Sequence, residues 1–259
     1  MKIRTAGLAA ASSLALAIMA SVAQAADAPK PDFSGVWTIY RAPGAPAGPG
    51  RADSGAFPRD PPFTAEAKAK VAEYRALVEP QGLTPGGACV GYGMPSAMLS
   101  SGGYPMEWIQ RPEQVTVVYE AHSEIRRIYI GGPAPNPRDL IPSRDGNSFG
   151  HWEGDTLVVE TLGLKEAVDQ SSAHSDKAKI VERYSLGKDD SGRKVLTAEM
   201  TLTDPVFYTK PVTATKKWLA VENGRLLPYD CTEPAWEDQL DKLRQEAKAK
   251  APADSAKKP

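Results

Sequence analysis

Apolar and polar positions alternate with a period of two over most of the chain from Met106 onward. In the segment Lys194–Thr203, the even-numbered positions from Leu196 to Leu202 are apolar, and their odd-numbered neighbours are Thr and Glu. This pattern predicts strands with one covered face and one hydrated face. The segments predicted as strands are Asp32–Tyr40, Met106–Gln110, Gln114–His122, Glu124–Ile130, Phe149–Trp152, Thr156–Thr161, Ala178–Leu186, Lys194–Thr203 and Pro211–Glu222.

Short turn signals separate several of these segments. Glu153-Gly154-Asp155 and Asp189-Asp190-Ser191-Gly192 each predict a hairpin, and Asn223-Gly224 opens a third turn. Many consecutive strands with short connections are typical of a meander that closes into a barrel or packs as a sandwich. We therefore predict an all-β fold, as an antiparallel meander barrel.

Two helices are expected beside the strands. Thr64–Glu79 has a capping residue in Thr64 and a terminator in Pro80. Its apolar face comprises Ala67, Val71, Tyr74 and Val78. A C-terminal helix and disordered tail are expected over residues 235–259, after a single barrel domain at residues 26–234.

The N-terminus has the pattern of a secretory signal peptide. Lys2 and Arg4 precede an apolar stretch, and Ala23-Gln24-Ala25 matches a cleavage site, so residues 1–25 are expected to be removed. An uncleaved membrane anchor is the alternative, but the apolar stretch is short and rich in Ala and Ser. We expect a periplasmic or secreted protein without stable membrane insertion. In an oxidising compartment Cys89 and Cys231 can form a disulfide, or they remain two free buried thiols.

Composition narrows the function classes. The formal net charge is −1, from 31 basic and 32 acidic residues, whereas nucleic-acid-binding proteins usually carry a basic excess. With two cysteines, neither a disulfide-dense scaffold nor a cysteine-ligated metal cluster is expected. The 23 prolines and 22 glycines disfavour a helical bundle.

Two local patterns resemble known families. Gly35-Val36-Trp37, on the first predicted strand, resembles the G-x-W of lipocalin-type barrels, in which the tryptophan closes the base of the barrel. Gly150–Val159 reads GHWEGDTLVV and, with Tyr104–Glu107, Arg126–Tyr129, Glu182–Tyr184, Asp204-Pro205 and Tyr229–Glu233, resembles an uncharacterised family of secreted bacterial proteins. This resemblance covers Asp32 to Pro234. It implies a strand-rich, lipocalin-like domain with one disulfide and supplies no activity.

Two patterns of possible catalytic chemistry are weak. Gly146-Asn147-Ser148-Phe149-Gly150 matches G-x-S-x-G, but a nucleophile elbow requires a strand before it and a helix after it, and here a strand follows. A Gly-rich turn is the simpler reading. His122, His151 and His174 could together hold zinc, but they lie on separate segments, and we predict neither a metal site nor a cofactor. His122 ends a strand, where a solvated histidine is usual, and His174 lies in a polar loop.

The predicted strands also carry arginines and carboxylates. On Glu124–Ile130, either Arg126 or Arg127 must lie on the covered face, where a charge is costly unless it is paired. Glu107, Glu120 or Glu182 could pair with it in an internal salt bridge. Alternatively, the arginine anchors a carboxylate or phenolate in a cavity. We predict that Arg127, Tyr119, Trp152 and Glu182 bind the ligand and that Glu107 and His174 are the catalytic residues.

Three functions remain open at this point. The expected function is a periplasmic carrier for a small hydrophobic or aromatic compound. The alternative is a small acid–base enzyme (a lyase, isomerase or hydrolase) that acts in the same pocket, and the third is a structural protein of the envelope. Neither the ligand nor the oligomeric state follows from the sequence.

Overall fold

A computed structural model describes residues 29–42, 44, 57–100, 103–170, 172–231, 238, 241 and 245. The chain divides into two units, residues 1–30 and residues 31–259, and only the second contains described helices or strands. The expected signal peptide lies outside the described residues, as do nearly all of the expected C-terminal helix and tail. No helix among the described residues is long and apolar enough to span a bilayer.

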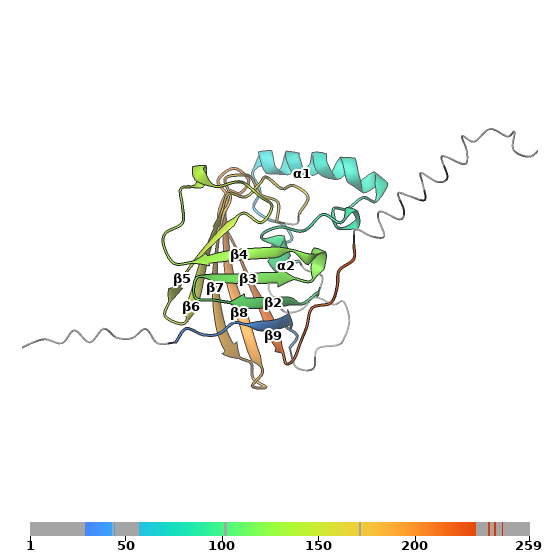
Figure 1. Ribbon diagram of the computed structural model, residues 1–259. Helices are drawn as coiled ribbons and strands as arrows, with labels where there is room; N and C mark the ends of the chain where they lie inside the picture. The colour runs from blue at the N-terminus through green and yellow to red at the C-terminus, as the bar shows by residue number, and fades with distance from the viewer. Residues whose placement is uncertain are drawn as a thin grey trace, which may run out of the picture. The chain divides into compact units, whose positions relative to one another are not determined.

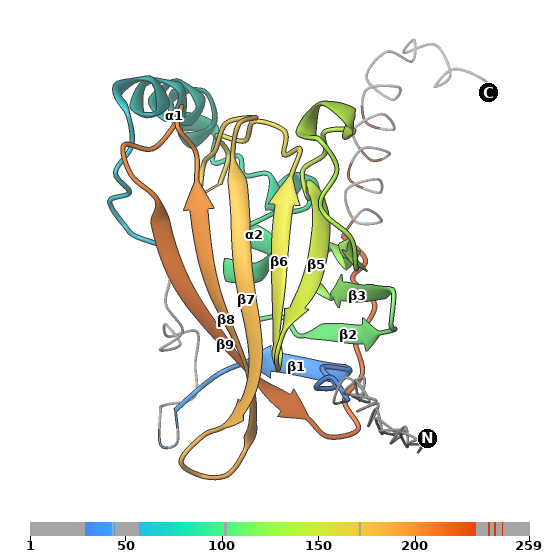
Figure 2. The ribbon, with the colours of Figure 1, turned by 90° about the vertical axis from the view of Figure 1, so that its left-hand side faces the viewer.

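Nine strands form one closed barrel in sequence order (Figures 1 and 2). β1 closes it by pairing antiparallel with both β2 and β9. The expected all-β barrel is therefore confirmed, and each predicted strand segment contains or overlaps one observed strand. The strands are β1 Gly35–Ile39, β2 Met106–Gln110, β3 Gln114–Tyr119, β4 Ile125–Ile130, β5 Asn147–Glu153, β6 Thr156–Leu162, β7 Lys179–Lys188, β8 Lys194–Thr203 and β9 Val212–Val221.

One strand pair departs from the expected antiparallel meander. β4 and β5 are parallel, with Ile128 opposite Ser148 and Ile130 opposite Gly150. Parallel neighbours need a crossover rather than a hairpin, and residues 131–146 supply one, with a short 3₁₀ helix, η4 (Pro137–Asp139), inside it. This crossover makes the barrel mixed rather than wholly antiparallel.

The predicted helix in the N-terminal half is present as α1 (Ala65–Val78). The Thr64 side chain accepts a hydrogen bond from the Ala67 backbone N–H at 3.2 Å and so caps the helix. Ala67 and Val71 are its buried residues. Figures 1 and 2 show α1 at one end of the barrel, which we call the mouth.

The segment between α1 and β2 contains an element that the sequence did not suggest. After the 3₁₀ helices η1 (Glu79–Gln81) and η2 (Gly86–Ala88), the chain forms α2 (Ser96–Leu99). All four residues of α2 are buried. Figure 2 shows α2 behind β7 and β6, inside the ring of strands, so this segment fills part of the barrel interior.

Aromatic packing closes the barrel at the end that carries β1. Trp37 is buried, and its indole N–H donates to the Phe33 carbonyl at 2.9 Å. Phe33 in turn packs against Trp108 and Trp152, with ring centroids 5.7 and 5.4 Å away. The G-x-W tryptophan thus lies in the core.

Candidate functional site

Arg126 is the arginine inside the barrel. On β4, burial alternates so that Arg126 and Ile128 face inward, while Arg127 is exposed on the outer face. The choice of Arg127 as the interior anchor was wrong, because a shift of one residue along a strand reverses the face. The charge pattern of IRRIYI does not distinguish the two arginines.

A complete set of partners surrounds the Arg126 guanidinium. Nε donates to Ser148 Oγ at 3.0 Å, and Nη1 donates to Glu182 Oε1 at 2.9 Å and lies 3.4 Å from Tyr184 Oη. Nη2 donates to Thr161 Oγ1 at 2.8 Å and to Glu182 Oε2. Because an arginine has five N–H donors, none remains for a ligand.

Burial and mutual charge determine the electrostatics of this cluster. Arg126 is 2% exposed and Glu182 is fully buried. Burial opposes the charged guanidinium, but the Glu182 carboxylate outweighs it and raises the pKa of Arg126. Burial also raises the pKa of Tyr119 and of Tyr184, so both phenols stay neutral. The cluster is therefore an internal salt bridge and not an arginine that anchors a ligand in a cavity.

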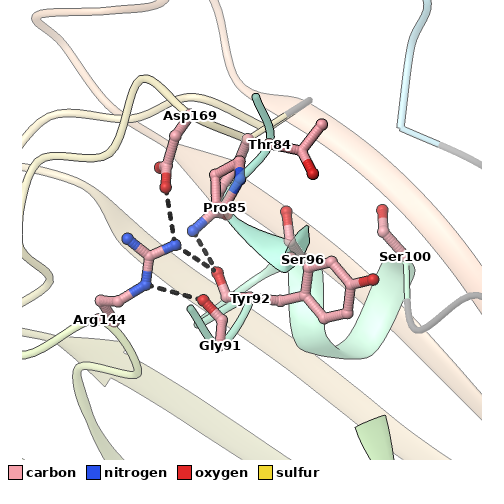
Figure 3. Close-up of a pocket in the computed structure, with 10 residues that line it drawn as sticks. Thr84, Pro85, Gly91, Tyr92, Ser96, Ser100, Arg144 and Asp169 are labelled. Atoms are coloured by element: carbon pink, nitrogen blue, oxygen red, sulfur yellow. Dashed lines mark hydrogen bonds and ion pairs between the residues drawn. The ribbon is translucent and has the colours of Figure 1, made fainter. Parts of the chain in front are cut away.

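A cavity of about 260 Å³ lies at the mouth of the barrel, and we call it the mouth cavity (Figure 3). Three parts of the chain build its wall: the segment before α2, α2 with the residue that follows it, and the long connections before β5 and β7. Its lining residues are Thr84, Pro85, Gly86, Gly91, Tyr92, Ser96, Ser100, Arg144, Asp169 and Gln170.

Arg144 holds one wall of the mouth cavity together. Its Nε donates to the Gly91 carbonyl at 3.0 Å, and Nη2 donates to Asp169 Oδ2 at 3.0 Å and lies 3.4 Å from the Tyr92 carbonyl (Figure 3). Asp169 Oδ1 is buried and has no hydrogen-bond partner among the described residues. A buried carboxylate oxygen without a donor is costly, so this wall carries an unsatisfied acceptor.

Hydroxyl groups and an aromatic ring form the rest of the surface. Ser96 Oγ and Ser172 Oγ are 2.8 Å apart, and Ser172 Oγ also lies 3.3 Å from Gln170 Oε1. The Tyr92 ring meets the His122 ring edge-on at a centroid distance of 4.9 Å. His122 is thus packed between Tyr92 and Tyr229 rather than solvated as expected. Burial lowers the pKa of His122.

Two features keep the wall segment in place. A disulfide joins Cys89 to Cys231, which confirms the expected pairing and ties the Thr84–Tyr92 segment to the stretch that follows β9. Gly91 lies so close to Glu124 that an added Cβ would be 2.6 Å from its Oε1. At Gly93 (φ +66°), an added Cβ would lie 2.7 Å from the carbonyl oxygen of Arg144. Side chains at these positions would displace the wall.

The expected catalytic pair is not assembled. Glu107 alternates with the buried Met106 and Trp108 on β2, so it points outward. His174 is fully buried in the loop before β7, where Nδ1 lies 3.1 Å from the Ser172 carbonyl, and it does not line the mouth cavity. Burial lowers the pKa of His174, which favours the neutral ring. Nε2 has no hydrogen-bond partner among the described residues.

Apart from the exposed Arg127, the expected ligand-binding residues pack in or against the core. Glu182 pairs with Arg126, and Tyr119 is buried beside that pair. Trp152 packs on Phe33 at the other end of the barrel. Ser148 lies in β5 and bonds Arg126 and Thr161, so the G-x-S-x-G pattern forms no nucleophile elbow.

The sequence pattern predicted no metal site, and it did not reveal the mouth cavity. Among the described residues, no three His, Cys, Asp or Glu side chains group as metal ligands. Arg144, Asp169 and Tyr92 lie 25 to 77 positions apart and were not singled out. The glycines at 86, 87, 91 and 93 were the available signal, since such a run often marks a close approach of the backbone to another group.

Comparison with known proteins adds no identification: no protein-family model matches the chain, and no curated protein matches it.

Proposed function

We propose that this protein binds a small ring compound in the mouth cavity and acts outside the cytoplasm as a carrier or receptor. The preformed cavity supports the proposal best. Its volume of about 260 Å³ suits a compound of one or two rings. Its walls combine the faces of Tyr92 and Pro85 with the hydroxyls of Ser96, Ser100 and Thr84. The Cys89–Cys231 disulfide favours an oxidising compartment.

The chemistry of the wall favours a ring that carries a hydrogen-bond donor. Asp169 Oδ1 is an acceptor without a hydrogen-bond partner among the described residues, and Arg144 already neutralises the carboxylate through Oδ2. A hydroxyl or amine on the ring can hydrogen-bond to the polar side chains that line this cavity, whereas a purely apolar ring would leave them unpaired. The predicted class of hydrophobic or aromatic compounds is thereby narrowed to those with a polar substituent.

Binding is a better reading than catalysis at this cavity. Ser96 Oγ, the most deeply placed hydroxyl in its wall, bonds Ser172 Oγ, and neither hydroxyl has a described carboxylate or imidazole side chain as a hydrogen-bond partner. A serine nucleophile needs such a base. The hydroxyls can nevertheless orient a ligand through neutral hydrogen bonds.

Phenol and toluene provide a first test, because they share a ring and differ in the donor. We expect saturation-transfer NMR to detect phenol binding more strongly than toluene binding. Ser100→Trp, which adds bulk to the cavity wall, should weaken phenol binding about tenfold or more. Ser191→Trp, in the exposed hairpin between β7 and β8, is the matched control and should bind like the unaltered protein.

The proposal fails if phenol binds equally to the Ser100→Trp and Ser191→Trp variants. Native mass spectrometry of protein isolated from the periplasm of its own cells gives an independent readout. A retained small molecule with a ring and a hydroxyl or amine would support the proposal, and a retained aliphatic compound would contradict it.

A further inference from the structure

A second cavity, of about 350 Å³, lies beside α1, and we call it the α1 cavity. Its apolar surface comes from Phe57 and Phe63 on the segment before α1, from Val71 on α1, and from Leu99 at the end of α2. Phe57 and Phe63 both pack on Tyr208, with ring centroids 6.2 and 5.0 Å away. The floor of this cavity is therefore a fixed aromatic surface.

The charges that line the α1 cavity are all positive. Among the described residues, Arg59 and Arg75 are the two charged ones that line it, and none of the lining residues carries a carboxylate. Arg59 has no hydrogen bond or ion pair with a described residue, and Arg75 has only a long contact, 3.9 Å from Nε to Glu79 Oε1, at the surface. The two guanidinium groups have N–H donors to spare and can bind a carboxylate, and the apolar floor beside them can bind an apolar tail.

We infer that the α1 cavity is a binding site for a small carboxylate with an apolar tail. The tail packs on Phe57, Phe63, Val71 and Leu99, and the carboxylate lies at Arg59 and Arg75. The α1 cavity and the mouth cavity share two lining residues, Ser100 and Gln170, but no charged lining residue. It does not depend on the function proposed for the mouth cavity, whose polar wall carries the Arg144–Asp169 pair.

The neighbouring surface is consistent with entry of an anion. An adjoining groove of about 470 Å³ runs along the outer side of α1 and shares Arg59, Phe63, Val71 and Arg75 with the α1 cavity. Lys68 adds a third positive charge there, against the carboxylates of Asp60 and Glu79. Three positive side chains and two carboxylates give the described lining of this groove a net positive charge.

Octanoate and 1-octanol separate the contribution of charge from that of the tail. In isothermal titration calorimetry, octanoate should bind more tightly than 1-octanol to the full chain, and its affinity should fall with added salt. Arg59→Gln should raise the octanoate Kd about fivefold, and Arg59→Gln with Arg75→Gln about twentyfold, with 1-octanol unaffected. Arg111→Gln, an exposed arginine between β2 and β3, is the control and should leave both Kd values unchanged.

Asp169→Asn distinguishes this site from the mouth cavity, since it alters only the wall of the latter. Octanoate affinity should not change in Asp169→Asn. If Arg59→Gln and the double variant bind octanoate like the unaltered protein, the inference is overturned. If Asp169→Asn changes octanoate affinity while the arginine variants do not, the carboxylate binds in the mouth cavity, which again overturns it and leaves the proposed function standing.

Discussion

Two arginine–carboxylate pairs in this protein have opposite surroundings. Arg126 and Glu182 lie inside the barrel at 2% and 0% side-chain exposure, whereas Arg144 and Asp169 lie at the mouth at 33% and 14%. All donors of Arg126 are used within the core, but Oδ1 of Asp169 at the mouth has no hydrogen-bond partner in the part of the chain that the structure describes. The same two residue types thus serve as core structure in one place and as part of a cavity wall in the other.

Asp145 connects the two regions. Burial is the main reason that its pKa is raised to about 6, and Glu124 adds to the rise. Arg126 and Arg144 both act in the opposite direction on the pKa of the same carboxyl. Replacing Arg126 or Arg144 should therefore change the pKa of the Asp145 carboxyl.

Removing Arg126 should have the largest effect. Arg126→Ala leaves Glu182 buried without its counter-charge, so we expect the free energy of unfolding to fall by about 3–5 kcal/mol. Urea unfolding at pH 7 measures this. Arg127→Ala, the neighbouring exposed arginine, is the matched control and should change stability by less than about 0.5 kcal/mol.

A double replacement sharpens this prediction. Arg126→Met with Glu182→Leu removes both charges and should recover much of the lost stability. If Arg126→Ala lowers the free energy of unfolding no more than Arg127→Ala does, the Arg126–Glu182 pair has no structural role, and the contrast with the Arg144–Asp169 pair is wrong.

Breaking the disulfide should affect the mouth more than the barrel. A disulfide that closes a segment of 142 residues is worth about 5 kcal/mol in the chain-entropy model, but Cys231 lies on a peripheral segment, so we expect a loss of about 2–4 kcal/mol in Cys89→Ser/Cys231→Ser. Hydrogen exchange should rise most in Thr84–Tyr92, and phenol binding should weaken. Reductant added to this double variant is the control and should have no effect. An equal rise in hydrogen exchange in β7 and β8 would contradict the expectation that the disulfide acts mainly at the mouth.

The Asp145 carboxyl should give the smallest effect, with a defined pH dependence. Between its ordinary pKa of 3.8 and about 6, the folded protein keeps a proton that the unfolded chain loses, so stability falls as pH rises through this window. Asp145→Asn removes that cost and should stabilise the protein by about 1–2 kcal/mol at pH 7.5 after allowance for partial exposure, and by almost nothing at pH 3.5. Asp190→Asn, in an exposed turn, should show no such pH dependence. A destabilised Asp145→Asn at pH 7.5 would show that the carboxylate is needed in its charged form.

Local patterns accounted for most of the fold. The period of two located the strands, and Thr64 and Pro80 bracketed α1, because alternation and capping depend on residues close in sequence. The parallel β4–β5 pair was missed, since the direction of a strand after a 16-residue connection depends on the path of the chain through space. The four-residue α2 was missed because so short a helix has no periodic signal.

The site was largely beyond the reach of sequence patterns. The two cysteines were paired correctly because the chain offers only one pairing. The choice between Arg126 and Arg127 failed because either register of IRRIYI puts one arginine and apolar residues on each face. Arg144 and Asp169 come from different connections, and no local spacing relates them.

The sequence by itself determined the strands, the N-terminal-half helix and the cysteine pair, because each is set by neighbours along the chain or by elimination. Only the tertiary structure decided which arginine is enclosed, that α2 enters the barrel, and where cavities remain. Burial and partner choice are properties of the packed barrel, in which residues as far apart in sequence as Val36 and Val221 pair with each other. Those distant contacts leave Arg126 with no spare donor, whereas Oδ1 of Asp169 at the mouth finds no hydrogen-bond partner among the described residues.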